Sequence, residues 1–152
     1  MHSRIIQLEK KPDFEPAVED DLQDLVDSGI ADYIVEMRGD EARNDALGWF
    51  TGHFGGMTVG EDDDGNTVIR IASRFDPLAR RLEEFKDKIT GLDIEKFCDY
   101  FWAFQVRNLL GDRHGFYCYS NYGGYWAADA FFRHLEGSNI VLYVGTIFDY
   151  HS

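Results

Sequence analysis

The sequence predicts an α+β fold, a single domain of residues 1–152 with helices packed on a mixed, mostly antiparallel sheet of about six strands. Segments rich in β-branched residues occur both as a hairpin pair and between helical segments, which favours a mixed sheet. The length of 152 residues is typical of one domain, and a hydrophobic content of 44% is sufficient for a core. No repeat, low-complexity tract or linker divides the chain.

The first elements follow from local residue types. The β-branched residues of segment 4–8 favour a first strand. Pro16 suits the first position of a helix, which the next glycine ends. Segment 30–37 is again rich in β-branched and aromatic residues and predicts a second strand. Asp40 can then cap a helix that runs to about Thr51.

The middle of the chain predicts a hairpin followed by a helix. An Asp-Gly pair at residues 64–65 lies between the β-rich segments 57–59 and 67–72, which is a strong hairpin signal. The Asp-Pro pair at residues 76–77 favours a helix start, and apolar residues at helical spacing extend this helix to Ile89.

The C-terminal half, residues 93–152, is rich in aromatic residues. Segment 97–132 alone holds 13 of the 23 aromatic residues of the chain. The helix predicted over residues 93–110 is apolar on more than one stripe, which indicates a central helix or one covered by a partner. The remaining predicted elements are a strand over 116–119, a loop over 121–124, a helix over 125–136 and a strand over 140–148.

Acidic residues are concentrated in the first half of the chain. Residues 1–64 hold 17 acidic and 5 basic residues, a net charge of −12, whereas residues 65–152 hold 11 and 10, a net charge of −1. Such a surface repels nucleic acid and anionic membranes and attracts basic proteins. Solubility, or adaptation to a salty cytosol, explains the same acidity without any partner.

Two acidic segments are candidates for contact with a basic partner. Residues 13–27 hold seven acids and no base, and Asp24 and Asp27 oppose the dipole of the predicted helix, which indicates a role other than helix stability. Carboxylates on such a helix and on a nearby turn can imitate the phosphates of nucleic acid. The candidate residues are Glu19, Asp20, Asp21, Asp24 and Asp27 in the helix and Asp62, Asp63 and Asp64 in the turn.

A second candidate surface is the aromatic loop that contains Asn121, Tyr122, Tyr125 and Trp126. Tyrosine and tryptophan combined with Gly, Ser and Asn are typical of adaptable binding loops. We expect these four residues to contact a partner or a ligand. The alternative is a glycine turn whose aromatic residues close onto the core.

Catalytic and metal-binding motifs are absent from the sequence. The Glu61–Gly65 turn does not match an EF-hand loop, and neither GxSxG, GxGxxG nor a P-loop occurs. The two cysteines, Cys98 and Cys118, have no CxxC or zinc-ligand spacing and predict buried thiols. We therefore expect no catalytic residue, metal or cofactor.

The leading hypothesis is a small, acidic, non-enzymatic interaction protein, an inhibitor or nucleic-acid mimic, that binds a basic nucleic-acid-binding protein or a toxin. It would contact neither nucleic acid nor membrane. The absence of a signal-peptide segment and of an apolar run of about 18–20 residues predicts a cytoplasmic location. The alternative is a small enzyme or ligand-binding domain with an aromatic-lined pocket that uses His114, His134 or Cys118. A third reading is an oligomer with helix 93–110 at its interface.

Overall fold

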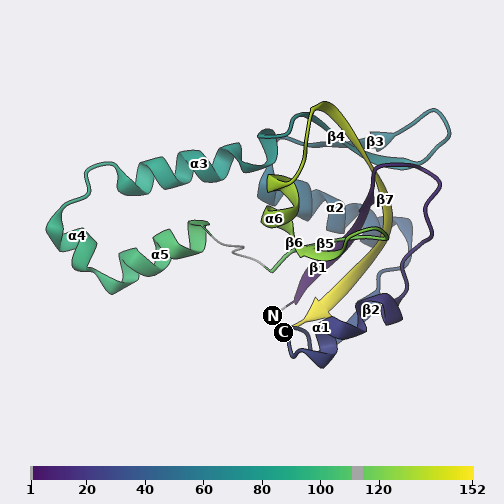
Figure 1. Ribbon diagram of the computed structural model, residues 1–152, viewed down its shortest axis with the longest axis horizontal. Helices are drawn as coiled ribbons and strands as arrows, with labels where there is room; N and C mark the ends of the chain where they lie inside the picture. Colours follow the sequence, from purple (N-terminus) through teal and green to yellow (C-terminus); the bar gives the residue numbers. More distant parts are fainter. Residues whose placement is uncertain (1, 111–114) are drawn as a thin grey trace.

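The computed structural model describes residues 2–110 and 115–152, and within them seven strands form one mixed sheet (Figure 1). The strand order is β3-β4-β7-β1-β5-β6, with β2 also paired to β7. Only the β1–β5 pair is parallel, so the predicted α+β fold with a mostly antiparallel sheet is confirmed. The strands are β1 (His2–Glu9), β2 (Tyr33–Glu36), β3 (Thr58–Glu61), β4 (Thr67–Ser73), β5 (Tyr117–Ser120), β6 (Gly124–Ala127) and β7 (Ser138–His151).

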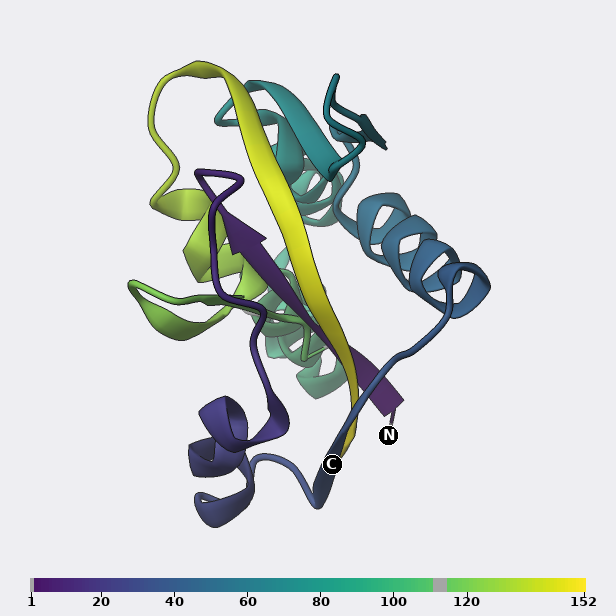
Figure 2. The same cartoon turned by 90° about the vertical axis from the view of Figure 1, so that its right-hand side faces the viewer.

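Strand β7 is the centre of the sheet. Its first half pairs with β4 and its last four residues pair with β2, while β1 runs along the other edge. The β3–β4 hairpin, predicted from its Asp-Gly pair, therefore lies toward one end of β7, and β2 lies at the other end (Figure 2). The sequence predicts β7 as a strand over residues 140–148, and the structure extends it to 14 residues.

The helices differ in how they contact this sheet. They are the 3-10 helix η1 (Glu19–Leu22), α1 (Gln23–Asp27), α2 (Asp40–Phe54), α3 (Asp76–Ile89), α4 (Ile94–Cys98), α5 (Tyr100–Leu110) and α6 (Ala128–Arg133). The main core lies where α2 and α6 bring Phe50, Phe54 and Phe132 together with Phe116. Cys118 is fully buried in the same core.

A second, smaller core lies on the opposite face of the sheet. Successive residues of a strand point to opposite faces, so Ile6 enters the main core whereas Ile5 packs with Phe148 in the smaller one. Leu22 of η1 and Leu25 of α1 cover this second face. The acidic segment is thus attached to the sheet through its apolar residues.

Helices α3, α4 and α5 form a helical arm, residues 76–110, that projects from the rest of the molecule, which we call the body (Figure 1). The prediction of one continuous helix over residues 93–110 is wrong, and of its two alternatives a central helix is excluded, whereas cover by a partner stays a prediction. The helix is broken at Asp99, whose backbone is extended and whose carboxylate accepts a hydrogen bond from the Phe101 amide at 2.9 Å, which starts a new helix. In α4 and α5 only Leu109 is buried.

Two helices begin later in the chain than predicted. The helix expected from Pro16 begins only at Glu19, because Gln7 holds the preceding backbone through hydrogen bonds with the Ala17 amide and the Glu15 carbonyl. The helix expected over residues 125–136 is preceded by strand β6, which pairs with β5 and delays the helix to Ala128.

Candidate functional site

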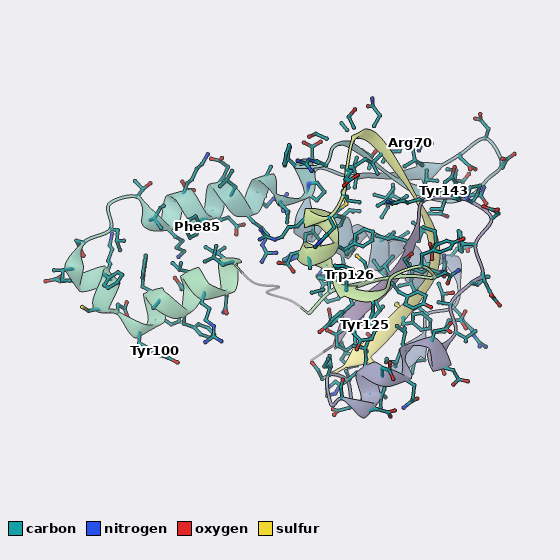
Figure 3. The ribbon with its side chains drawn as sticks, viewed as in Figure 1. Arg70, Phe85, Tyr100, Tyr125, Trp126 and Tyr143 are labelled. Atoms are coloured by element: carbon teal, nitrogen blue, oxygen red, sulfur yellow. The ribbon has the colours of Figure 1, made fainter. Side chains whose placement is uncertain are left out.

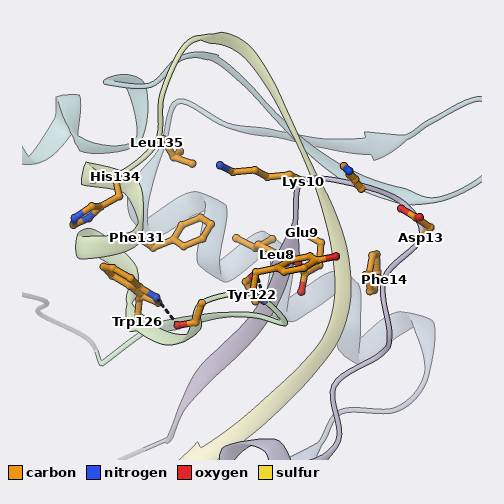
Figure 4. Close-up of a pocket in the computed structure, with 13 residues that line it drawn as sticks. Leu8, Glu9, Lys10, Asp13, Phe14, Tyr122, Trp126, Phe131, His134 and Leu135 are labelled. Carbon is orange, nitrogen blue, oxygen red and sulfur yellow. Dashed lines mark hydrogen bonds between the residues drawn. The ribbon is translucent and has the colours of Figure 1, made fainter.

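A cavity of about 410 Å³ opens at one end of the sheet, between the end of β1, the loop that follows it, the β5–β6 turn and α6. We call it the aromatic pocket (Figure 4). Its apolar lining consists of Leu8, Phe14, Tyr122, Trp126, Phe131 and Leu135. Its polar and charged lining consists of Glu9, Lys10, Lys11, Asp13, Ser120 and His134. A cavity of this size that combines aromatic and aliphatic walls with polar and charged groups is typical of a small-molecule site.

Glu9 is the buried charged group of the pocket. Only 3% of its surface is exposed. One carboxylate oxygen accepts hydrogen bonds from the Asn121 amide at 2.7 Å and from Gln7 Nε2 at 3.2 Å, and the other accepts from Ser120 Oγ at 2.9 Å. Within the described part of the chain Glu9 forms no ion pair with a lysine or arginine. The carboxylate is therefore fixed in place by neutral donors.

Gln7 donates a hydrogen bond to Glu9 and is itself completely buried. Its Oε1 accepts hydrogen bonds from the backbone amides of Ala17 at 2.8 Å and Thr146 at 3.1 Å, and its Nε2 donates to the Glu15 carbonyl at 2.9 Å. A single side chain thus connects β1, β7 and the segment before η1. These contacts satisfy backbone groups that would otherwise be buried without partners.

A bulge makes room for this network. The register of β1 against β7 shifts between Ile6 and Leu8, so two residues of β7, Gly145 and Thr146, face Gln7 alone. A Cβ atom at Gly145 would lie 2.6 Å from Gln7 Cδ and 2.8 Å from Phe14 Cε2. Glycine at this position therefore permits both the hydrogen-bond network and one wall of the pocket.

Trp126 forms another wall, and its ring is held on two sides. Its Nε1 donates a hydrogen bond to the Gly123 carbonyl at 2.9 Å, and the His134 ring packs edge-on at 4.9 Å between centroids. His134 Nδ1 lies 2.8 Å from the Ala130 carbonyl, which can only accept, so Nδ1 carries the proton. His134 thus positions Trp126 at the edge of the pocket.

The predicted aromatic loop is divided between the two faces of the sheet. Tyr122, which is 93% exposed, and Trp126 both line the pocket. Asn121 donates from its side chain to the Glu15 carbonyl at 2.9 Å and from its backbone to Glu9. Tyr125 points to the opposite face, where its ring packs against Tyr117 at 6.1 Å.

The three residues considered for chemistry do not form one site in the described structure. His134 lines the pocket, Cys118 is buried in the main core, and His114 lies outside the described residues. Cys98 is exposed on the arm, contrary to the expectation that both thiols are buried. The residues that sequence reasoning missed are Gln7 and Glu9, since their role depends on contacts more than 100 residues away in the chain.

The acidic helix segment is exposed, but several of its carboxylates have structural partners. Glu19 accepts a hydrogen bond from the Glu36 amide at 3.0 Å, which fixes β2. Asp21 accepts from the Val18 amide at 2.8 Å, which caps η1. Asp27 accepts from the Gln23 side chain at 2.9 Å. The exposed carboxylates of Asp20 and Asp24 complete the segment.

The acidic turn lies at the other end of β7 from this segment (Figure 2). Hydrogen bonds from the Asn66 side chain and backbone lower the pKa of Asp62, which also accepts from the Asp64 amide. Asp63 and Asp64 are exposed. The two groups of acids therefore form separate surfaces.

The arm carries several large apolar side chains that are exposed in the described structure, and we call them its apolar face. They are Ile94, Phe97, Tyr100, Phe101 and Phe104, and Tyr100 points away from α3 with 85% of its surface exposed (Figure 3). The opposite side of α5 faces α3, where Trp102 Nε1 donates to the Lys88 carbonyl at 3.2 Å and Lys88 Nζ donates to Gln105 at 2.8 Å. Helix α5 thus contacts α3 through one side, and Tyr100 points away from that contact.

No known protein family, curated protein or solved structure matches this chain. Within the described residues, no helix is long and apolar enough to cross a membrane. The described residues also contain no group of three or more His, Cys, Asp or Glu side chains placed to hold a metal ion.

Proposed function

We propose that this chain is a non-enzymatic interaction protein that binds a basic protein through its helical arm, with the acidic body steering the approach. The observation that carries the proposal is the uncovered aromatic face of α4 and α5. Exposed apolar patches of this kind mark protein contact surfaces in soluble proteins.

The size of this face is sufficient for a protein contact. Four of its aromatic residues, Phe97, Tyr100, Phe101 and Phe104, are 49–85% exposed. At about 150–250 Å² for each side chain, they expose roughly 400–650 Å² of mostly apolar surface. The largest apolar patch of a typical monomer measures about 300–600 Å², and each side of a standard interface buries about 800 Å². The arm thus offers the apolar centre of an interface.

The charge distribution favours a basic partner. The arm holds 7 acidic and 6 basic residues, a net charge of −1, so −12 of the total charge of −13 lies outside it. A second copy of the same chain is repelled by this charge, whereas a basic protein is attracted and steered toward the body. The exposed carboxylates of Asp20 and Asp24 are available for steering.

An inhibitor or nucleic-acid mimic is the narrower form of this proposal. A protein that normally binds nucleic acid presents a basic surface, and its contact with an acidic body would block that surface. Since the two acidic groups lie at opposite ends of β7, we expect the η1–α1 segment and the Asp62–Asp64 turn to contact different parts of such a partner. We expect the encounter to take place in the cytoplasm.

Affinity capture with two sets of variants tests the proposal. The arm variant F97S/F101S/F104S removes aromatic contact area, and its matched control V35S/V59S changes exposed apolar residues of the body. A basic protein captured by the parent and by the control, released at high salt and lost with the arm variant, is the expected result. The charge variant D20K/D24K should slow the association of that protein.

Light scattering of the purified chain completes this test. A monomer is expected at low and high salt. A dimer that the arm variant disrupts would show that the apolar face binds a second copy, and it would replace the proposed basic partner. In the capture experiment, retention that is lost with V35S/V59S or D20K/D24K but not with the arm variant would also contradict the role of the arm.

A second candidate function is the binding of a small ligand in the aromatic pocket, which the 410 Å³ cavity favours. Ligand binding is better supported than catalysis there. The Cys118 thiol is buried in the core, and His134 is placed to hold the Trp126 ring.

A further inference from the structure

We infer that the aromatic pocket binds a small zwitterion that carries a primary to quaternary ammonium group, with this group at Glu9 and the anionic group toward Lys10 and Lys11. The inference rests on the second candidate function, ligand binding in this pocket, and is independent of the arm and of the partner proposed for it. It rests on the charge, the walls and the rim of the pocket.

The first argument is the buried charge of Glu9. Carboxylates are seldom buried without a positively charged partner, because the desolvation of a charge is costly. Glu9 is 97% buried, yet the groups that reach it are the neutral donors of Gln7, Ser120 and Asn121. A cation bound in the pocket would supply the missing counter-charge.

The second argument is the acceptor capacity that remains on this carboxylate. A carboxylate offers about four lone-pair positions to donors. Three are used, two of them on Oε1 and one on Oε2, where Ser120 donates at 2.9 Å. One lone-pair position on Oε2 thus has no donor within the described residues.

The third argument is the aromatic enclosure. Phe14, Tyr122, Trp126 and Phe131 contribute rings around the cavity (Figure 4). The negative faces of such rings attract ammonium groups, and Trp is the most effective of them. The Trp126 ring is already ordered before a ligand binds, because its Nε1–H donates a hydrogen bond to the Gly123 carbonyl and the His134 ring packs on it. This preorganisation lowers the entropic cost of binding.

The rim of the pocket decides between ligand types. Lys10 and Lys11 are exposed, they line the cavity, and neither forms an ion pair within the described residues. In Figure 4, Lys10 extends away from Glu9. Even with Asp13 beside them, the two lysines leave a positive rim that disfavours a polycationic ligand such as a lysine-rich peptide. A ligand with one positive and one negative group can place the positive group at Glu9 and the negative group at Lys10 and Lys11.

Three small probes test this assignment by calorimetry on the whole chain: glycine betaine, its cationic part as tetramethylammonium, and its anionic part as acetate. We expect saturable binding of betaine, weaker binding of tetramethylammonium and no binding of acetate. Absence of betaine binding at millimolar concentrations would overturn the inference. So would acetate binding as tight as that of betaine, because it would indicate an anion site on the lysines.

Variants assign the binding to the named groups. E9Q should lower betaine affinity about tenfold or more by removing the counter-charge, and W126L should lower it about three- to thirtyfold by removing the ring. W126F, which keeps a ring, should recover part of that loss. K10M/K11M should weaken betaine and leave tetramethylammonium unchanged or tighter. If E9Q fails to fold, the probe series and the tryptophan variants still test the inference. An unchanged betaine affinity in W126L would contradict the role of the aromatic walls.

Discussion

Two parts of the same aromatic segment, residues 97–132, differ in the exposure of their aromatic side chains. In the body, Phe116 and Phe132 are completely or almost completely buried among the side chains of α2. In the arm, Phe97 and Phe101 are each 64% exposed. The residue types and their density are alike, so the difference arises from topology. The sheet and α2 supply partners to one half of the segment, and the arm supplies α3 alone to the other.

This comparison separates two uses of apolar surface. Burial of an aromatic side chain within the fold stabilises the folded chain by itself, whereas an exposed aromatic side chain contributes only when another molecule covers it. Stability of the body and binding by the arm should therefore respond to different substitutions, and each can be changed while the other is left intact.

The largest expected effect comes from truncating equivalent phenylalanines in the two regions. F132A should lower the free energy of unfolding by about 3–5 kcal/mol because it leaves a cavity in the main core. F101A should change the same quantity by about 0.5 kcal/mol or less because its side chain lies mostly in water. Urea unfolding monitored by circular dichroism measures the free energy of unfolding of both variants. Equal losses in the two variants would show that the arm face is covered in solution and would end the comparison.

Sequence reasoning succeeded where local signals decide the structure. The Asp-Gly pair correctly predicts the β3–β4 hairpin, and the Asp-Pro pair with its apolar spacing correctly predicts α3. The α+β class also follows, because β-rich segments occur both as a hairpin pair and between helical segments. For helix 93–110, the breadth of the apolar surface was detected, but composition could not distinguish a core helix from an arm that lacks a partner.

The candidate site was predictable only in part. Tyr122 and Trp126 were identified by residue type, and both line the pocket. Glu9 could not be found in this way, because it is the last residue of a strand followed by two lysines and resembles an exposed charge. Its burial depends on Ser120 and Asn121, which are 111 and 112 residues away. Nothing in the local sequence encodes such a distant contact.

A smaller effect is expected from filling the space at Gly145, and it tests whether the body is packed as tightly as the buried network requires. G145A should lower the free energy of unfolding by about 1–3 kcal/mol, since the new methyl group collides with Gln7 and Phe14. The matched control is G48A in α2, where nothing lies within 4 Å of the added atom. That control should raise stability by about 0.4–1 kcal/mol. Thermal unfolding of both variants gives the sign of each change in stability. A G145A variant as stable as the parent would mean that the bulge can relax.

The smallest effect on overall stability is expected from the cap of α4, within the arm. Asp93 accepts a hydrogen bond from the Lys96 amide at 2.9 Å, and D93A should weaken this helix by about 0.5–2 kcal/mol. Because α4 has no buried residue, it can unfold locally without the body, so most of this loss should not appear in the global unfolding midpoint. Hydrogen exchange resolves the difference: amides of residues 94–98 should exchange faster in D93A, whereas those of β7 should be unchanged. Faster exchange in β7 as well would show that the arm and the body unfold as one unit, and the two regions would then differ in exposure but not in cooperativity.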